Sequence, residues 1–411
     1  PFENYDFAEQ ICTIALIFIM FYGGFGTRWS EAKPVAAKSI VMSTVGVAAT
    51  AGLTGLFCHF ILKFPLWESM LTGSVISSTD AASVFSILRS KKLGLKENTA
   101  SLLEMESGSN DPCSYMLTAI ILSIMGGKIS GGAIVYLIFA QFAYGLILGF
   151  VIAIGAKLVL QHFKFSTEGF DAAFVLAVAV LAYALPSAIG GNGYLSTYIV
   201  GIILGNSDIK NKKSMVHFFD GLTGLMQMLI FFLLGLLSFP SALPKVFPTA
   251  LAISLFLMLI ARPIVTFGIL TPMKCSLRQS LLVSWSGLRG AASIVFAIMA
   301  TVTAENLKND IFHIVFCIVL ISISLQGTLI PFMAKVFDNN SNVLKTFNDY
   351  VEELDVQFIK LTVQGEHPWK DKRIRELSIP WDLLFVLIIR GDQSIIPNGK
   401  TKIKDGDIVV V

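Results

Sequence analysis

The stretch from Glu104 to Pro112 places carboxylates and an amide in a segment that then continues as apolar sequence. Inside hydrocarbon each charge costs about 3 kcal/mol on insertion scales, so it needs a partner or a function. In a helix, Ser107 and Asp111 share one face at positions i and i+4, and Asn110 lies beside them. Glu106 points about 100° away from Ser107, because a helix turns once in 3.6 residues. The stretch therefore predicts an oxygen-rich ion face and a separate carboxylate that needs a cation elsewhere.

Asp111 is the first candidate ion ligand. A single carboxylate binds either a proton or a monovalent cation, so the two compete for it. The alternative is that Asp111 caps its own helix before Pro112. We favour the ligand interpretation because apolar sequence continues beyond it, and ionisable residues inside membranes are functional by default.

The polar run from Ser77 to Asp80 interrupts a second apolar segment. Unwound backbone there would free the carbonyl and hydroxyl of Thr79 as oxygen ligands, and Asp80 would complement the positive end of the following half-helix. The alternative is an ordinary helix N-cap by Ser78 or Asp80 at a loop. The apolar run 66–76 favours a helix broken within the membrane.

The run from Ser284 to Gly290 interrupts a third segment and carries Arg289. A guanidinium cannot shed its proton, so Arg289 needs a carboxylate partner. We predict Glu106 as this partner, in a structural ion pair that joins two helices, with Glu104 as the competing partner. Arg262 is a second intramembrane base, which either pairs with an acid or snorkels to the inner face.

The composition is that of a membrane protein, with 54% hydrophobic and 14% charged residues. Soluble domains carry roughly 25% charged residues. The net charge of +3 is small and predicts no nucleic acid polymer as a partner. Eleven hydrophobic segments are near the roughly 20 residues that cross a bilayer, except the short seventh. They cover residues 8–26, 35–62, 67–88, 99–125, 131–160, 172–189, 194–206, 216–238, 248–271, 279–302 and 310–336.

Two interrupted helices, one in each half of a chain, indicate a midplane site in an inverted-repeat transporter. A further glycine-rich interruption spans residues 190–193. We predict an all-α polytopic membrane domain over residues 1–337, a linker over 338–349 and a small α+β cytosolic domain over 350–411. No nucleophile–base pair or nucleotide motif indicates an enzyme.

Lys and Arg residues are distributed unequally between alternate loops, which predicts orientation. The richer set of loops holds Arg28, Lys33, Lys38, Arg89, Lys91, Lys92, Lys96, Lys157, Lys164, Lys210, Lys212, Lys213, Lys274, Arg278 and Lys335. The poorer set holds Lys63, Lys128, Lys245 and Lys308. The richer side is predicted to be cytoplasmic, and it carries the tail.

Four motifs, in order along nearly the whole chain, resemble the cation/proton antiporter-1 family, most closely its NhaP-type potassium/proton antiporter branch. They are Ser78-Thr79-Asp80-Ala81-Ala82-Ser83-Val84-Phe85, Glu106-Ser107-Gly108-Ser109-Asn110-Asp111-Pro112, Gly190-Gly191-Asn192-Gly193-Tyr194-Leu195 and Gly287-Leu288-Arg289-Gly290-Ala291. The family has thirteen spans, so this chain is expected to correspond to spans three to thirteen, without the first two.

The resemblance implies a site for a monovalent cation and a proton at Asp111, Ser107 and Thr79. Asn110 would brace this site, and Asp80 would support the crossing of the half-helices. The resemblance also implies a core ion pair between Glu106 and Arg289. Electrogenic relatives carry two adjacent aspartates, whereas Asn110 stands first here, which predicts electroneutral exchange of one proton for one cation.

The tail alternates in the manner of strands over residues 356–363, 383–389 and 407–411, with a short helix predicted over Lys372–Leu377. With Arg390 and the turns 397–399 and 405–407, it resembles the C-terminal (TrkA-C-like) lobe of the regulator-of-potassium-conductance fold. Such lobes dimerise and often bind a small ligand, in some cases a cyclic dinucleotide. The alternative is a folded domain without a ligand.

We therefore predict a bacterial inner-membrane transporter that exchanges K⁺ for H⁺ by alternating access, with no cofactor besides the transported ions. Its expected partners are the lipid bilayer, a second copy of the chain and a small-molecule regulator at the tail. An electroneutral Na⁺/H⁺ exchanger is the alternative within the class, because oxygen ligands are generic. A ligand-gated cation channel is the alternative from another class, although no TVGYG-like carbonyl filter is present.

Overall fold

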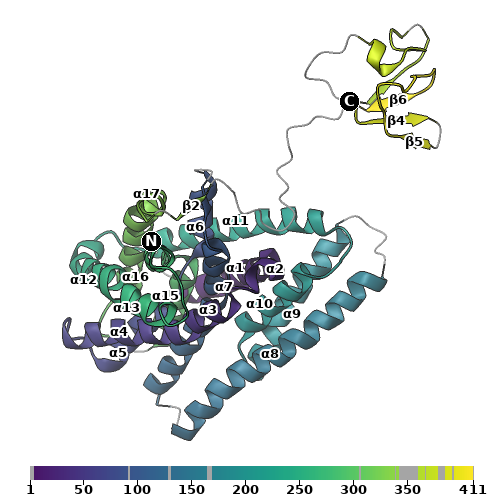
Figure 1. Cartoon of the computed structure of the whole chain (residues 1–411). Helices are drawn as coiled ribbons and strands as arrows, with labels where there is room; N and C mark the ends of the chain where they lie inside the picture. The colour runs from purple at the N-terminus through teal and green to yellow at the C-terminus, as the bar shows by residue number, and fades with distance from the viewer. Residues whose placement is uncertain are drawn as a thin grey trace. The chain divides into compact units, whose positions relative to one another are not determined.

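The computed structural model describes residues 4–90, 93–127, 131–163, 169–304, 307–337, 339–341, 360–365, 367–377, 385–390 and 393–410. The chain divides into two compact units, Pro1–Asp349 and Tyr350–Val411 (Figure 1). Most of the predicted linker 338–349 lies outside the described residues. Each unit is described by itself below.

All eleven predicted membrane segments are helical. The unbroken ones are α1 (Tyr5–Gly26), α7 (Thr99–Met125), α8 (Gly131–His162), α9 (Phe170–Ala188), α10 (Gly193–Gly205) and α11 (Lys212–Leu237). Three contain a π-helical turn: α3 (Ala36–Val41) with η1 (Met42–Gly46) and α4 (Val47–Phe60), α12 (Leu243–Phe256) with η2 (Leu257–Ala261) and α13 (Arg262–Leu270), and α16 (Ile311–Ile321) with η3 (Ser322–Gly327) and α17 (Thr328–Val336). Two are broken: α5 (Leu66–Val75) with α6 (Ala81–Ser90), and α14 (Leu277–Trp285) with α15 (Ala291–Thr303).

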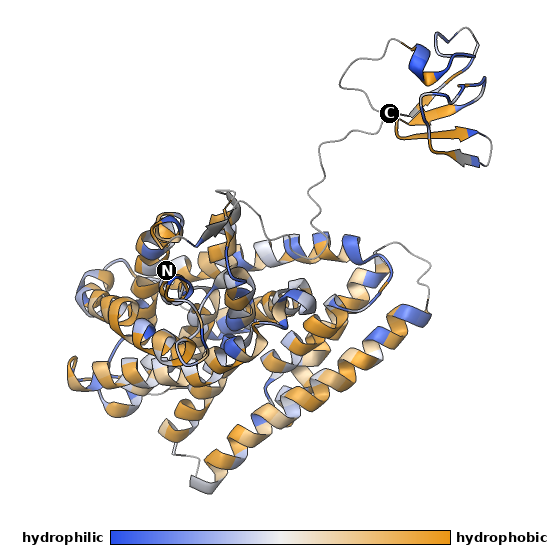
Figure 2. Cartoon of the chain, viewed as in Figure 1, coloured by the Kyte–Doolittle hydropathy of each residue, from blue (hydrophilic) through white to orange (hydrophobic). Residues whose placement is uncertain are grey.

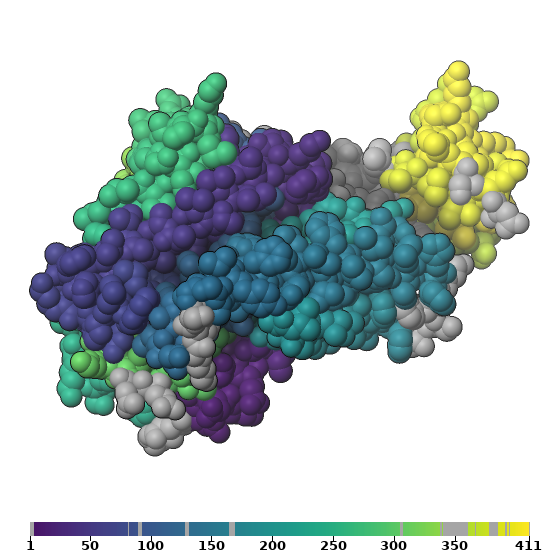
Figure 3. Space-filling view, turned by 90° about the horizontal axis from the view of Figure 1, so that it is seen from below, coloured from purple at the N-terminus to yellow at the C-terminus, as the bar shows by residue number. Residues whose placement is uncertain are grey.

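Seven of these segments are long and apolar enough to cross a bilayer by length and composition alone. The others are the two broken helices, the short α10, and α7, whose carboxylates lower its hydropathy. Figure 2 shows that α8 and α9 are apolar along most of their length. Figure 3 shows α8 as a continuous rod on the surface. Its exposed side chains include Val135, Phe139, Phe150 and Ile154, as expected of a face covered by lipid.

The helices of the first unit pack as two groups. The five-helix group consists of α1, α8, α9, α10 and α11, and the six-span group holds the remaining spans. The six-span group contains spans two to four and nine to eleven, so each half has a broken helix as its middle span. Equivalent spans are seven apart, an odd number, so the two halves cross the membrane in opposite directions. This is the predicted inverted repeat.

The two broken helices cross at their extended segments. The backbone N–H of Asp80 donates to the carbonyl of Leu288 across the crossing, at 2.9 Å. Gly290 lies so close to Asp80 that an added Cβ would stand 2.0 Å from Oδ2 of the carboxylate. Only glycine fits there, which explains the residue type at this point of the second break.

Short elements connect the helices. The helical turn α2 (Trp29–Ala32) follows α1, and β1 (Gly94–Leu95) pairs antiparallel with β2 (Asn340–Ser341). Basic residues such as Arg28, Lys96, Lys210 and Lys274 lie in loops at one set of helix ends. We call this the basic side of the unit and the other the opposite side.

In the described residues of the second unit, the strands form an antiparallel sheet in the order β3-β6-β4-β5. Its strands are β3 (Lys360–Thr362), β4 (Leu387–Arg390), β5 (Gln393–Ile395) and β6 (Ile408–Val410). They bury a small core of Val363, Ile388, Ile403 and Val409. The predicted helix over 372–377 is a shorter 3₁₀ turn, η4 (Ile374–Glu376), and β5 was not predicted. Residues 356–359 of the first predicted strand lie outside the described part.

An ion pair joins the end of β4 to the residue that precedes β6. Arg390 donates to both carboxylate oxygens of the buried Asp407, each at 2.7 Å. Burial alone would raise the pKa of Asp407, but the bonds from Arg390 and the Lys404 backbone lower it below its ordinary value. A lowered pKa in the folded state stabilises the domain above about pH 4, and this contribution is lost as the pH falls further.

We expect Asp407→Asn to destabilise the second unit by about 1–2 kcal/mol at neutral pH, since Arg390 is partly exposed and the pair is partly screened. Hydrogen exchange of the β6 amides in the full chain would measure it. In the wild type, part of the hydrogen-exchange protection of β6 should disappear as the pH falls below about 4, and the variant should lack this pH-dependent part. Asp405→Asn is the control, because the Asp405 carboxylate is exposed and pairs with Lys370 at 3.0 Å. Equal effects of the two variants would contradict a stabilising role of the Arg390–Asp407 ion pair.

Candidate functional site

The predicted ion-site residues meet at the first break. Ser107 donates from Oγ to the carbonyl of Thr79 at 2.7 Å, and Asn110 donates from Nδ2 to Oγ1 of Thr79 at 2.5 Å. Asp111 accepts a short hydrogen bond from the hydroxyl of Ser78. All five of these side chains are buried. The α7 face predicted from i, i+3 and i+4 spacing therefore packs directly on the unwound backbone of the broken helix.

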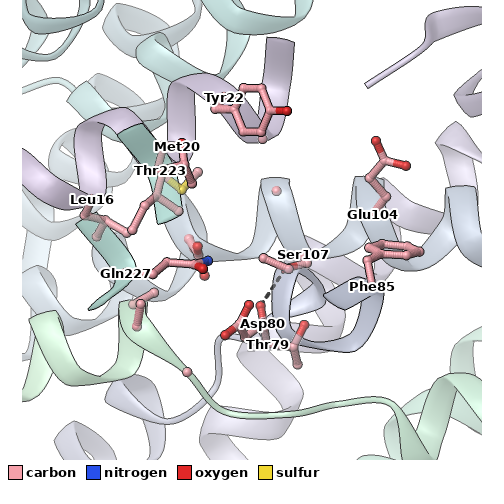
Figure 4. Close-up of a pocket in the computed structure, with 18 of the residues that line it drawn as sticks. Leu16, Met20, Tyr22, Thr79, Asp80, Phe85, Glu104, Ser107, Thr223 and Gln227 are labelled. Carbon is pink, nitrogen blue, oxygen red and sulfur yellow. Dashed lines mark hydrogen bonds between the residues drawn. The ribbon is translucent and has the colours of Figure 1, made fainter. Parts of the chain in front are cut away.

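A cavity of about 370 Å³ reaches this site between the two helix groups. The six-span group contributes Thr79, Asp80, Ser107 and Asp111, and the five-helix group contributes side chains from α1 and α11. Figure 4 shows Tyr22 and Met20 of α1 and Gln227 of α11 across the cavity from Ser107 and Thr79.

The cavity extends toward the basic side. Its lining on α7 includes Glu104, Ser107, Gly108 and Asp111 but nothing beyond Asp111, and α7 starts at its basic end. Further lining comes from Ser86 in the basic half of α6 and from Asp220 in the basic half of α11. Tyr22 donates to the Asp220 carboxylate at 3.0 Å. The cavity therefore extends from Asp111 toward the basic side.

Asp80 does not contact Asp111 through a hydrogen bond. Its carboxylate accepts from the backbone N–H of Ser83 at 3.1 Å and from the Ser83 hydroxyl at 2.6 Å. It therefore caps α6, a negative charge at the positive end of a helix, while its own N–H bonds the second break. Both interpretations of Asp80, as a cap and as support for the crossing, describe this geometry.

The predicted pair of Glu106 with Arg289 is wrong. Glu106 accepts from Arg262 at 2.6 Å, and both side chains are buried. Arg289 instead donates to the carbonyl of Ser77 at 2.8 Å and, in a short bond, to that of Ser78. The break exposes carbonyls at the negative end of α5, and these attract the Arg289 guanidinium. Of the two alternatives for Arg262, pairing with an acid is the one observed.

Charges at the crossing thus complement the two half-helix ends that meet at the first break. Arg289 lies at the C-terminal end of α5, and Asp80 lies at the N-terminal end of α6. Unsatisfied helix ends would be costly at membrane depth, so these two side chains stabilise the break itself. Neither of them needs to bind the ion.

Two residues of the site were not predicted in their observed roles. Ser78, considered only as a helix cap, is the hydrogen-bond partner of Asp111. Its place one residue before Thr79 was the available signal. Arg262 was identified as a base without a specific partner. Nothing in the sequence around Arg262 indicates Glu106 as its ion-pair partner, because the two residues are 156 positions apart.

Comparisons with known proteins agree with this architecture. Residues 2–336 match the family model described as "Sodium/hydrogen exchanger, transmembrane", and residues 359–411 match the TrkA-C domain. The chain is 30% identical over 423 residues to the K(+)/H(+) antiporter NhaP of Alkalimonas amylolytica, covering 100% of this chain and 73% of that protein. It is 29% identical over 315 residues to Na(+)/H(+) antiporter 1 of Methanocaldococcus jannaschii, covering 73% and 72%.

The fold is also similar to a solved structure. The sodium proton antiporter MjNhaP1 from Methanocaldococcus jannaschii at pH 8 superposes with a TM-score of 0.70 at 25% identity, covering 81% of this chain and 87% of that chain. The family match covers residues 2–336, which include the crossing and the candidate ion site. The chain therefore belongs to the sodium/hydrogen exchanger family and is a multi-pass monovalent cation/proton antiporter of the lipid bilayer, with a TrkA-C domain at its C-terminal end.

Proposed function

We propose that this antiporter exchanges one K⁺ for one H⁺, electroneutrally and by alternating access. The observation that carries the proposal is that Asp111 lies at the base of the cavity, with hydroxyl and carbonyl oxygens around it and Asn110 as its neighbour on α7. A lone carboxylate is neutralised either by a proton or by a monovalent cation. One charge enters for each that leaves, so the exchange moves no net charge.

The ligands would rearrange when the cation binds. In the structure Ser78 donates to Asp111, and Ser107 donates to the Thr79 carbonyl. Rotation of these two hydroxyls would direct their oxygens, with the Thr79 carbonyl and the Asp111 carboxylate, at one cation. Asn110 would hold Thr79 in place through its bond to Oγ1. Asp80, Glu106, Arg262 and Arg289 would keep the crossing rigid without contacting the ion.

Potassium is proposed over sodium because of the tail and the relatives. The TrkA-C match accompanies 30% identity along the whole chain to proteins named K(+)/H(+) antiporters. The oxygens of the site suit either ion, so Na⁺/H⁺ exchange is the second candidate. The solved relative MjNhaP1, which is named a sodium proton antiporter, favours that candidate.

The surroundings of the protein follow from the same proposal. The basic side would face the cytoplasm of a bacterial inner membrane, with the tail on that side. The cavity would then open inward. We further propose that the chain forms a homodimer and that a small molecule, such as a cyclic dinucleotide, regulates it through the second unit.

Flux through the purified protein in liposomes tests the proposal. A pH gradient is imposed, KCl, NaCl or choline chloride is added, and the internal pH is followed with and without valinomycin. We expect K⁺ to dissipate the gradient at the same rate when the membrane potential is clamped. A response to Na⁺ alone would show that Na⁺ rather than K⁺ is the substrate. A rate that changes with the membrane potential would exclude electroneutral exchange. Cation flux without proton counterflow would indicate a channel.

A further inference from the structure

Asn192 joins the two helix groups immediately next to the ion site. It lies in the loop between α9 and α10, in the five-helix group, and is 2% exposed. Its Nδ2 donates to the carbonyl of Pro112, the residue after Asp111 on α7, at 2.8 Å. Figure 1 shows α10 and α7 in the centre of the unit, and the two helices are in contact.

The remaining polar atoms of Asn192 hold it firmly to its own group. Its side-chain oxygen accepts from the backbone N–H of Leu195 at 3.0 Å and so caps α10. Its backbone N–H donates to the carbonyl of Gln141 on α8 at 3.1 Å. The Asn192 side chain is therefore fixed to the five-helix group and contacts α7 through its bond to Pro112.

This contact lies on the closed side of the site. The α7 residues that line the cavity end at Asp111, so Pro112 lies beyond it, toward the opposite side. Aromatic rings also meet there across the groups. Tyr194 of α10 contacts Tyr115 of α7, with ring centroids 5.0 Å apart, and Phe296 of α15 at 6.4 Å. The site can open to the opposite side only if this layer separates.

We propose that Asn192 is a positioning residue that fastens α7 at Asp111 to the five-helix group and stabilises the conformation open to the basic side. The inference rests on the proposed alternating access. Breaking the Asn192–Pro112 bond is then part of each transport cycle. Removing the bond should shift the population toward the conformation open to the opposite side by about fivefold, the factor expected for one buried hydrogen bond.

The test compares Asn192→Asp and Asn192→Ser in the full chain. Aspartate keeps the helix cap but loses the donor, and serine also caps well but is too short to reach Pro112. Spin labels at positions 63 and 189, both exposed on the opposite side and one in each group, report the separation of the groups. The labels are placed after replacement of the five native cysteines, with exchange checked in this background.

Asn206→Ser is the matched control. Asn206 follows the other end of α10, and its Nδ2 donates to the Thr27 carbonyl at 2.8 Å, within the five-helix group. We expect both Asn192 variants, and not the Asn206 variant, to increase the population with a second, longer distance between the labels about fivefold. The apparent KM for cation supplied from the opposite side should fall by a similar factor, since more of the protein is competent to bind there.

Unchanged distances in both Asn192 variants would overturn the inference, and so would an equal change in Asn206→Ser. The outcome is separable from the proposed function. A protein that exchanges Na⁺, or moves net charge, would still show the distance shift if Asn192 fastens the groups. Conversely, K⁺/H⁺ exchange can hold while the distances stay the same.

Discussion

Asp111→Asn is expected to reduce cation-dependent proton flux in liposomes to the rate of protein-free vesicles. The amide has nearly the shape of the carboxylate and can still accept the hydrogen bond from Ser78. It cannot release a proton or supply the negative charge that a bare cation needs at membrane depth. The variant should therefore fold and reach the membrane normally. The flux assay described above measures the loss.

Asp220→Asn provides the control for this prediction. Asp220 lines the same cavity from α11, where it is bonded to Tyr22. A carboxylate there affects the approach of cations rather than their exchange for protons, so we expect transport to persist with a raised KM. Retained exchange in Asp111→Asn would mean that Asp111 is a structural acid, and the proposed site would be wrong.

The ion pair of Glu106 with Arg262 gives the second large effect. Glu106→Gln leaves a buried guanidinium that cannot lose its proton, and breaking such a pair costs about 3–5 kcal/mol. Arg262→Met should cost less, because the remaining Glu106 can take up a proton. The double variant removes both charges and should recover most of the loss, because a neutral pair of similar volume is often tolerated. Unfolding of the purified protein in detergent measures all of these changes.

A parallel cycle with Arg289 distinguishes the observed pair from the one that the sequence predicted. Arg289 bonds backbone carbonyls of the break and is not the ion-pair partner of Glu106, so Arg289→Met should rescue Glu106→Gln much less than Arg262→Met does. Rescue by Arg289→Met but not by Arg262→Met would show that the predicted pair forms after all. The double-mutant cycle isolates this coupling even though all three side chains are buried together.

Helix periodicity and hydropathy were sufficient to predict the spans. Each of the eleven apolar segments is helical, because backbone in hydrocarbon must satisfy its own hydrogen bonds. The two breaks were also predicted, since Ser77–Asp80 and Gly287–Gly290 are polar or glycine-rich at membrane depth. In the tail, the alternation indicated β4 and β6, but the three-residue β5 is too short for a periodic signal.

The face of α7 that carries the ion site was likewise determined by sequence. Ser107, Asn110 and Asp111 lie within one helical turn, so their common direction follows from 3.6 residues per turn. All three contact the Ser78–Thr79 segment, as that spacing requires of a single neighbour. Their roles in binding the cation and proton remain predictions.

Tertiary structure alone decided which distant groups neutralise which charges. Periodicity fixes the side of a helix on which Glu106 lies, but not which of two arginines faces that side. In the folded protein Arg289 bonds the Ser77 and Ser78 carbonyls that the break exposes, and Glu106 pairs with Arg262. Contacts such as Asn192 with Pro112 arise in the same way, from packing between helices 80 residues apart. Local sequence determines which elements form and which way they face, whereas charge partners depend on distances that only the packed helices define.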